Sequence, residues 1–403
     1  MTDPTEKDRV PAPLAGISVI EIASYISGPL AGSLLAGLGA EVIKIEQPAL
    51  GDPFRSWGGG DYSPTFQSVN RGKRSLVVDL RTPDGVGIAN RLLATSDVLV
   101  ENLRPGALWR LGIDIDMIRN VNPGLVECSI SGFGLTGPYA ERPGYDTIGQ
   151  AVGGLLGLLT DFDEPQPMGV SVSDHLTALN AALGVVASLA GRASDPAGRG
   201  RQVSTSLFQA TVSFVGENAA RYFADGVVPT RQARVALAQA YAFTAGDGYP
   251  FVIHLSSSER FWLALTSAID RPDLRDDPRF DRLAQRITHY DDLHEELARC
   301  FGSDDRQHWL DRLAAADVPA GPIQRFDELF TDPGLTELDV VDTVRHPSAG
   351  EMRLIGPGFT LRGLDRSRVL APPLLGEHTD MILGGLGFDQ NEIARLREAG
   401  VVA

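Results

Sequence analysis

Asp174 is the residue whose type and position best suit chemistry. It stands at the head of a long apolar segment, 174–189, that is typical of a buried helix. A carboxylate there feels the positive end of the helix dipole and stays ionised, and an ionised, positioned carboxylate can act as a nucleophile. Ser171 and Ser173 are close enough in sequence to orient it. Aspartate is also a preferred N-cap residue, so the residues alone favour a structural role.

A glycine-rich motif, G-x-G-x-x-G, runs from Gly132 to Gly137 after an expected strand. A nicotinamide fingerprint of this form must open a long helix. Pro143 and Gly144 interrupt the chain soon afterwards, and the segment has no helical apolar period. We therefore expect a packing or active-site loop and no nicotinamide cofactor.

Basic residues concentrate in the run 70–75, Asn-Arg-Gly-Lys-Arg-Ser, and recur at Lys44, Arg104 and Arg110. Lys and Arg bind phosphate through charge-assisted hydrogen bonds, and ligands of open parallel sheets bind at the carboxyl ends of the strands. These residues suit a phosphorylated ligand at that edge, although a solvated surface explains a Lys-Arg pair equally simply.

Composition excludes several classes of function. The chain has 403 residues and a net charge of -16, which argues against nucleic acid or an anionic membrane as the main partner. No uncharged apolar run reaches the roughly 18 residues of a membrane span, and the polar N-terminal segment lacks a signal-peptide core, so we expect a cytoplasmic protein. Cys128 and Cys300 are expected to be unpaired thiols, and the histidines show no metal-ligand spacing.

The elements that must position these residues follow an α/β pattern. A short strand at 17–22, an apolar helix at 30–38 and a strand at 41–46 form a βαβ unit, which implies a parallel sheet. Further strands are expected at 76–80, 97–100 and 125–130, with a helix at 83–94 that Thr82 caps. A hairpin is expected within 241–255, around the glycines 246 and 248.

The expected domain boundaries lie where the hydrophobic pattern of the sequence changes. We expect a large domain over 1–220, a linker over 221–240, and a small α+β domain over 241–330. The remaining segment, 331–403, is expected to be a second linker followed by a return to the large domain.

Taken in order, the segments resemble one family, the class III CoA-transferases, which includes formyl-CoA transferase, carnitine CoA-transferase and the α-methylacyl-CoA racemases. The likeness covers nearly the whole chain. It lies in the segments 13–22, 28–29, 38–46, 70–75, 97–106, 132–134, 137–138, 143–146, 198–203 and 371–379.

The resemblance implies a Rossmann-like large domain with a mostly parallel sheet, a smaller α+β domain, and an interlocked homodimer. It also implies that Asp174 is the nucleophile, which reverses the structural reading of that residue. Asp174 would attack the thioester carbonyl of an acyl-CoA and carry the exchange through anhydride and aspartyl-CoA thioester intermediates. Such covalent catalysis divides one difficult exchange into easier steps, and it needs no metal.

Coenzyme A positions of the family map onto Ser24, Tyr25, Ile26, Lys73, Arg74, Asn102, Leu103 and Arg110. Related transferases often carry Gln where Ile26 stands. Ile26 cannot make a side-chain hydrogen bond, so the handling of the intermediates differs at this position.

Tyr145 separates the two activities of the family. The racemases carry a histidine where Tyr145 stands, paired with the aspartate that matches Asp174. A tyrosine, with a pKa of ~10, exchanges protons poorly at neutral pH. We therefore expect CoA transfer between an acyl-CoA and a carboxylic acid, with 2-methylacyl-CoA racemisation as the alternative. A third hypothesis is a CoA-binding protein that has lost its catalytic activity. The presence of an aspartate at position 174 argues against it.

Overall fold

The computed structural model describes residues 11–256, 258–364 and 370–403. They form two compact units. The first contains the described residues up to Leu156 together with Pro167–Glu217 and Asp339–Ala403, and the second contains Gly157–Gln166 and Asn218–Leu338. The first unit therefore draws on both ends of the chain.

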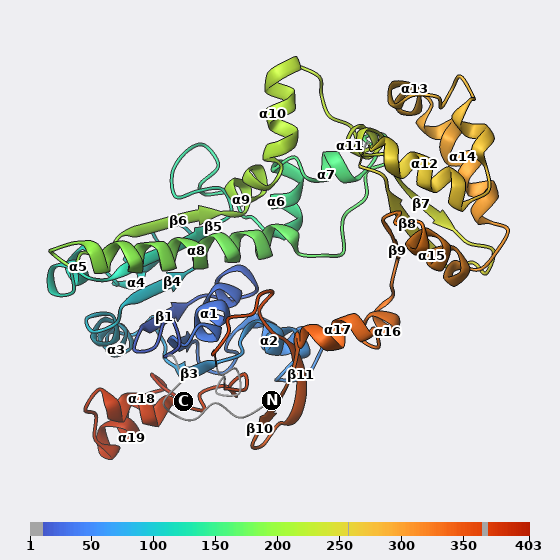
Figure 1. Cartoon of the computed structure of the whole chain (residues 1–403). Helices are drawn as coiled ribbons and strands as arrows, with labels where there is room; N and C mark the ends of the chain where they lie inside the picture. The colour runs from blue at the N-terminus through green and yellow to red at the C-terminus, as the bar shows by residue number, and fades with distance from the viewer. Residues whose placement is uncertain (1–10, 257, 365–369) are drawn as a thin grey trace. The chain divides into compact units, whose positions relative to one another are not determined.

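A six-stranded parallel sheet with the strand order β3-β2-β1-β4-β5-β6 forms the centre of the first unit (Figure 1). The strands have the following bounds: β1 Ser18–Ile22, β2 Glu41–Glu46, β3 Lys73–Val77, β4 Val98–Glu101, β5 Val126–Ser131 and β6 Gln202–Ser206. The expectation of an α/β fold with a parallel sheet is confirmed. The strand order reverses direction between β1 and β4, and this point in an open sheet is where ligands bind.

Helices cross over between the strands, as parallel pairing requires. Those of the first unit are α1 Ser27–Gly37, α2 Pro64–Val69, α3 Pro83–Leu93, α4 Ala107–Leu111, α5 Ile115–Val121, α6 Asp146–Val152, α8 Val172–Ser194, α9 Leu207–Phe214, α18 Thr379–Gly385 and α19 Gln390–Glu398, with a 3₁₀ turn η2 at Pro53–Ser56. The start of α3 shows the expected local chemistry: Pro83 is its first residue, and the Thr82 hydroxyl accepts a hydrogen bond from the Gly85 amide at 3.1 Å.

Alternating side chains build a core on each face of the sheet. Val19 and Val98 belong to the core beneath α1 and α8, whereas Ile20 and Leu99 belong to the core beneath α3, α18 and α19 (Figure 1). The long helix α8 is thus fixed against one face of the sheet, with its first turn close to the carboxyl ends of the strands.

The C-terminal segment packs on the edge of this sheet. Val402 bridges to Val78, the Val401 carbonyl accepts from the Asp79 amide at 2.8 Å, and the His378 amide donates to the Ser75 carbonyl at 3.1 Å. A hairpin of β10 Val341–His346 and β11 Gly350–Ile355 precedes it.

The second unit contains a three-stranded antiparallel sheet, β7-β8-β9, with its own apolar core. Its elements are α10 Gly216–Asp225, which starts at the boundary, α11 Arg231–Ala238, β7 Ala240–Thr244, β8 Pro250–His254, α12 Glu259–Ala268, η3 Pro272–Arg275, α13 Leu283–Thr288, α14 Tyr290–Phe301, α15 Arg306–Ala315, β9 Ala320–Pro322, α16 Phe326–Leu329 and α17 Pro333–Leu338; α7 Leu156–Leu159 lies at the other boundary. The hairpin expected within 241–255 is confirmed by β7 and β8.

Two segments differ from the expected elements. The 221–240 segment, expected as a linker of weak period, is mostly helical in α10 and α11, and neither helix has a buried residue. The third strand begins at Lys73, three residues before the expected Leu76, because two of its first three residues are polar yet buried. This shift places Lys73 and Arg74 at the amino end of the strand, opposite the carboxyl edge.

Within the described ranges, α8 is the one helix whose length and composition would allow it to cross a membrane. The core helix of a soluble protein passes the same test. Here Ala178, Ala181, Val185 and Leu189 of α8 pack into the core beneath the sheet.

Candidate active site

Asp174 lines a cavity of about 330 Å³ in the first unit, which we call the Asp174 cavity. Its walls come from the turn after β1, the loop after β4, the loop between β5 and α6, and the first turn of α8. The lining residues include Ser24, Tyr25, Ser27, Asn102, Leu103, Arg104, Arg142, Gly144, Tyr145 and Asp174. Five of the residues predicted to catalyse the reaction or to bind coenzyme A therefore share one cavity with Asp174: Ser24, Tyr25, Asn102, Leu103 and Tyr145.

Asp174 lies inside the first turn of α8, which begins at Val172, and is not the residue that caps this helix. Its amide donates to Oδ1 of Asp146 at 3.0 Å. Its carboxylate accepts a hydrogen bond from the Ser27 hydroxyl at the start of α1. The serines near it in sequence do not orient it: Ser173 is buried against Thr211, with 2.7 Å between their hydroxyls.

Burial, and after it the neighbouring carboxylate of Asp146, raise the pKa of Asp174 to about 7, while the Ser27 hydrogen bond acts in the opposite direction. The helix dipole alone predicts a fully ionised carboxylate. Loss of water and the like charge outweigh it. The result is a half-buried carboxyl group that changes protonation near neutral pH, a property that clusters at functional sites.

Tyr145 and Tyr25 form an aromatic wall of the cavity. Their rings meet edge to face with centroids 5.7 Å apart, and Tyr25 packs in the same manner on Phe54 at 5.5 Å. Burial raises the pKa of Tyr25, and the hydrogen bond with Tyr145 also raises it.

The turn between β1 and α1 is strained and firmly held. Tyr25 has φ 66°, a left-handed conformation that bulky residues rarely adopt. Asn102 holds Ser24, the residue before Tyr25, by two hydrogen bonds. Its side chain accepts from the Ser24 amide at 2.9 Å and donates to the Ser24 carbonyl at 2.7 Å. Asp52 accepts from the Tyr25 amide at 3.2 Å.

A buried network of ion pairs lies beneath this turn. Glu21 bridges two lysines, with 2.8 Å from Oε1 to Lys44 Nζ and 2.8 Å from Oε2 to Lys73 Nζ. Lys44 also contacts Asp52 at 2.9 Å and donates to the Ala23 carbonyl at 2.7 Å. All four side chains are fully enclosed. Burial lowers the pKa of Lys44, but the charges of Glu21 and Asp52 outweigh it and the net change is upward.

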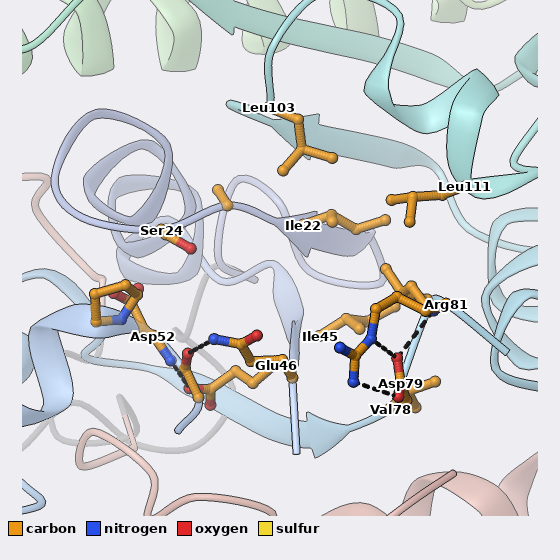
Figure 2. Close-up of a pocket in the computed structure, with 15 residues that line it drawn as sticks. Ile22, Ser24, Ile45, Glu46, Asp52, Val78, Asp79, Arg81, Leu103 and Leu111 are labelled. Atoms are coloured by element: carbon orange, nitrogen blue, oxygen red, sulfur yellow. Dashed lines mark hydrogen bonds and ion pairs between the residues drawn. The ribbon is translucent and has the colours of Figure 1, made fainter. Parts of the chain in front are cut away.

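A second cavity, of about 280 Å³, opens at the carboxyl ends of β1, β2 and β3, and we call it the strand-end cavity. Figure 2 shows its apolar side chains, Ile22, Ile45, Leu103 and Leu111, together with Arg81 bonded to Asp79. The Arg81 side chain is 80% exposed and makes two 2.8 Å contacts with that carboxylate. The two cavities share Ser24 and Leu103, so they adjoin.

Four residues expected at the site lie outside both cavities. Lys73 is enclosed, with Glu21, the Pro29 and Val69 carbonyls and the Asn70 side chain around its ammonium group, so its three donors already have partners. Arg74 pairs with Glu41 at 2.9 Å at the amino end of the sheet. Ile26 packs on the buried cluster of Phe54, Phe66 and Val69, and Arg110 is exposed with its guanidinium near Gly106.

Among the residues that the sequence did not single out, Ser27 and Arg142 line the Asp174 cavity, Asp146 contacts Asp174, and Arg81 lines the strand-end cavity. Arg81 directly follows the expected strand 76–80, so a search for cations just after the strands would have found it. Ser27 and Asp146 contact Asp174 only through the fold, and nothing in their sequence spacing indicates it.

The glycine motif occupies the loop after β5 and opens no helix, since α6 begins only at Asp146. Across the described part of the chain, no group of three or more histidine, cysteine or acidic side chains is arranged to hold a metal ion.

Comparison with known proteins places this geometry in a family. A family model described as CoA-transferase family III matches residues 14–379. Succinyl-CoA:glutarate CoA-transferase of Homo sapiens is 32% identical over 397 residues, which is 97% of this chain and 90% of that protein. Acetyl-CoA:oxalate CoA-transferase of Acetobacter aceti is 36% identical over 318 residues, covering 77% of this chain and 80% of that one.

Solved structures agree. A CAIB/BAIF family protein from Brucella suis superposes with a TM-score of 0.82 at 32% identity, covering 93% of this chain and 99% of that chain. The Rv3272 protein from M. tuberculosis gives a TM-score of 0.81 at 28% identity, covering 93% and 100%.

The raised pKa of Asp174 predicts a pH-dependent cost to stability. Its folded pKa of about 7 lies above the ordinary 3.8, so folding is penalised progressively as pH rises from about 4 to about 7 and the penalty is constant above. Asp174→Asn removes the charge. We expect the variant to match the wild type below pH 4 and to be more stable by about 2–4 kcal/mol at pH 8.

Thermal unfolding over that pH range measures the difference. Asp116→Asn is the matched control, because Asp116 is also a first-turn aspartate but is 94% exposed. A stability difference that does not vary with pH would contradict the raised pKa of Asp174.

Proposed function

Because the chain belongs to CoA-transferase family III and is a CoA-transferase, we propose that it moves coenzyme A from an acyl-CoA thioester to a free carboxylic acid through covalent intermediates on Asp174. The observation that carries the proposal is the placement of Asp174. It is a half-buried carboxylate without a cationic partner among the described residues, in a cavity that adjoins the carboxyl edge of the sheet.

The exchange has four balanced steps. The Asp174 carboxylate attacks the thioester carbonyl and expels CoA thiolate, which leaves a mixed anhydride. The thiolate attacks the aspartyl carbonyl and releases the donor acid, which leaves an aspartyl-CoA thioester. The acceptor carboxylate attacks this thioester and again expels thiolate. The thiolate then attacks the acceptor's acyl carbonyl, which yields the new acyl-CoA and restores Asp174.

Each tetrahedral intermediate carries an oxyanion that needs preorganised donors. The first turn of α1 supports this role. Its Ser27 lines the Asp174 cavity, and the amides of Ser27 and Gly28 precede the first intrahelical hydrogen bond, which the Leu30 amide makes to Ile26. We assign the Ser27 hydroxyl to holding the carboxylate of Asp174 and these amides to the oxyanion.

The two adjoining cavities suit coenzyme A with its adenine end in the strand-end cavity and its thioester end in the Asp174 cavity. The apolar side chains of the strand-end cavity suit the flat adenine ring, and exposed Arg81 suits a phosphate. The pantetheine arm then passes Ser24 and Leu103, which both cavities share, and brings the thioester to Asp174. Asn102 acts through Ser24 by holding that turn.

Tyr145 supports transfer over racemisation. It lies in the Asp174 cavity against Tyr25, where a tyrosine hydroxyl can donate a hydrogen bond to an acyl oxygen but is a poor general base. Racemisation of a 2-methylacyl-CoA would appear as deuterium incorporation at C2, and we expect none.

Exposed apolar side chains on three helices that pack against one another support a homodimer. Ile148 and Val152 of α6, Leu179 and Leu183 of α8 and Phe214 of α9 are each 43% or more exposed. Monomeric soluble proteins seldom leave an apolar surface of this kind uncovered. We propose that a second copy of the chain covers it, in the interlocked arrangement that the family implies.

Replacing the nucleophile tests the mechanism directly. Asp174→Ala should lower the rate of CoA exchange by at least about 10³-fold, because no side chain remains to form the covalent intermediates. His175→Ala is the matched control: His175 adjoins Asp174 but is exposed and bonded to the Ser171 carbonyl, so activity should change less than about twofold. Hydroxylamine added with acyl-CoA should convert Asp174 of the wild type to a hydroxamate that peptide mass spectrometry locates. Retained exchange in Asp174→Ala would refute the covalent route.

A pair of variants separates CoA binding from structure. Arg81→Gln should raise KM for the acyl-CoA about 10-fold with little change in kcat, because one charge-assisted contact to phosphate is lost. Lys73→Met should instead lower stability by about 3–5 kcal/mol, since it leaves the buried Glu21 carboxylate without one of its partners, and should not change KM. Steady-state kinetics and thermal unfolding distinguish the two. The reverse pattern would show that Lys73 holds the ligand.

Light scattering after size exclusion tests the assembly. We expect a mass twice that of the 43.1 kDa chain, because the exposed apolar residues require a cover. A 43.1 kDa particle at micromolar concentration would exclude the homodimer.

A further inference from the structure

Two arginines line the Asp174 cavity without an acidic partner. Arg104 follows the Asn102–Leu103 loop, and Arg142 precedes Tyr145 by three residues. Neither forms an ion pair with any carboxylate in the described residues, whereas most of the other arginines in that part of the chain do. The mechanism above uses neither of them. The cavity therefore carries positive charge that the transfer of CoA does not itself require.

Arg142 is exposed to solvent, and its guanidinium lies over an aromatic ring that packs on two further rings. Phe208 of α9 packs on Phe133 with ring centroids 6.3 Å apart, and Phe133 packs on Tyr139 at 6.0 Å. The guanidinium carbon of Arg142 lies 4.1 Å above the centre of the Tyr139 ring, and the Arg142 amide donates to the Tyr139 carbonyl at 2.9 Å. A stacked guanidinium loses little freedom when it binds a ligand, because its plane is already fixed.

The base of the same loop is closed by backbone contact. A Cβ on Gly144 would lie 2.9 Å from the Gly132 Cα, and one on Gly132 would lie 3.1 Å from the Gly144 Cα. The loop thus returns to the end of β5 within two residues of Arg142. Arg142 and Tyr145 are fixed relative to that strand end and both line the Asp174 cavity.

Arg142 and Arg104 differ in their surroundings. Arg104 also lines a separate cavity that holds Glu101, Asp114, Asp116 and Glu127, and it follows directly the loop that we assign to coenzyme A. Arg142 lies on the Tyr145 side, away from the strand-end cavity, whose lining does not include it. The acyl group must occupy this side when the thioester is at Asp174.

We propose that Arg142 binds the second carboxylate of a dicarboxylic acid, and so selects dicarboxylates over monocarboxylates as acyl groups of this transferase. The inference rests on the proposed function. One carboxylate of the acid reacts at Asp174, and the other meets a planar guanidinium whose paired N–H groups match the two oxygens of a carboxylate. A monocarboxylic acid of the same length would instead place an apolar end against this cation, which then loses water without gaining a partner.

The test compares two acceptors of equal length, glutarate and valerate, with succinyl-CoA as the donor in both. In a double-displacement reaction, kcat/KM for the acceptor reports only the steps from the aspartyl-CoA intermediate onward, so effects on the donor cancel. We expect the wild type to prefer glutarate, and Arg142→Gln to lower kcat/KM for glutarate by about 10- to 100-fold with less than about threefold change for valerate.

Arg91→Gln is the matched control. The Arg91 guanidinium also lies over an aromatic ring, 4.4 Å from the centre of Phe388, but lines neither cavity, so the preference for glutarate should equal that of the wild type. Equal losses for both acceptors in Arg142→Gln, or an unchanged ratio, would overturn the assignment of Arg142. So would a wild type that transfers CoA to valerate as readily as to glutarate, although the proposed function would then survive. Failure of the proposed function is a separate result: no transfer to either acid and no hydroxamate at Asp174.

Discussion

The site depends on one buried interaction, the bridge that Glu21 makes between Lys44 and Lys73. These residues come from three adjacent strands, and their charges are enclosed where no water reaches them. Such a group is tolerated only when every partner is present, and removal of one partner is strongly destabilising. Gly32 of α1 is required above it, because a Cβ there would lie 2.0 Å from the Glu21 carboxylate. The network therefore links strands β1, β2 and β3 and sets how closely α1 can pack on the sheet.

The same network also holds the turn between β1 and α1, which lines the Asp174 cavity. Lys44 holds the Ala23 carbonyl and Asp52, and Asp52 in turn holds the Tyr25 amide. The left-handed Tyr25 persists because these contacts and Asn102 over-determine the turn. The consequence is the position of Ser27, at the start of α1, beside a carboxylate that lies 147 residues later in the chain (174 − 27).

Sequence reasoning reached the βαβ pattern, the family and Asp174, but for different reasons. The strands were readable from short apolar runs, whereas the role of Asp174 came from the resemblance, since composition alone favoured a cap. The start of β3 was misplaced because Lys73 and Ser75 are polar yet buried, and burial of charge depends on partners in β1 and β2 that no local pattern reveals. The same limit applies to Ser27 and Asp146, which approach Asp174 only because the fold brings distant segments together.

The environment of Asp174 suits covalent catalysis because acylation removes a charge. Burial and the Asp146 carboxylate raise the free energy of the ionised carboxylate, and the raised pKa of Asp174 expresses this penalty on ionisation. Anhydride and thioester formation at the same oxygen or carbonyl carbon neutralise the group just as protonation does, so each covalent intermediate escapes the same penalty. A solvated aspartate has no such penalty to lose, and its attack on a thioester would end in a comparatively unstable anhydride. In the mechanism proposed above, the cavity thereby narrows the free-energy gap between the resting enzyme and its acylated forms, which favours the exchange of one acid for another without any input of energy.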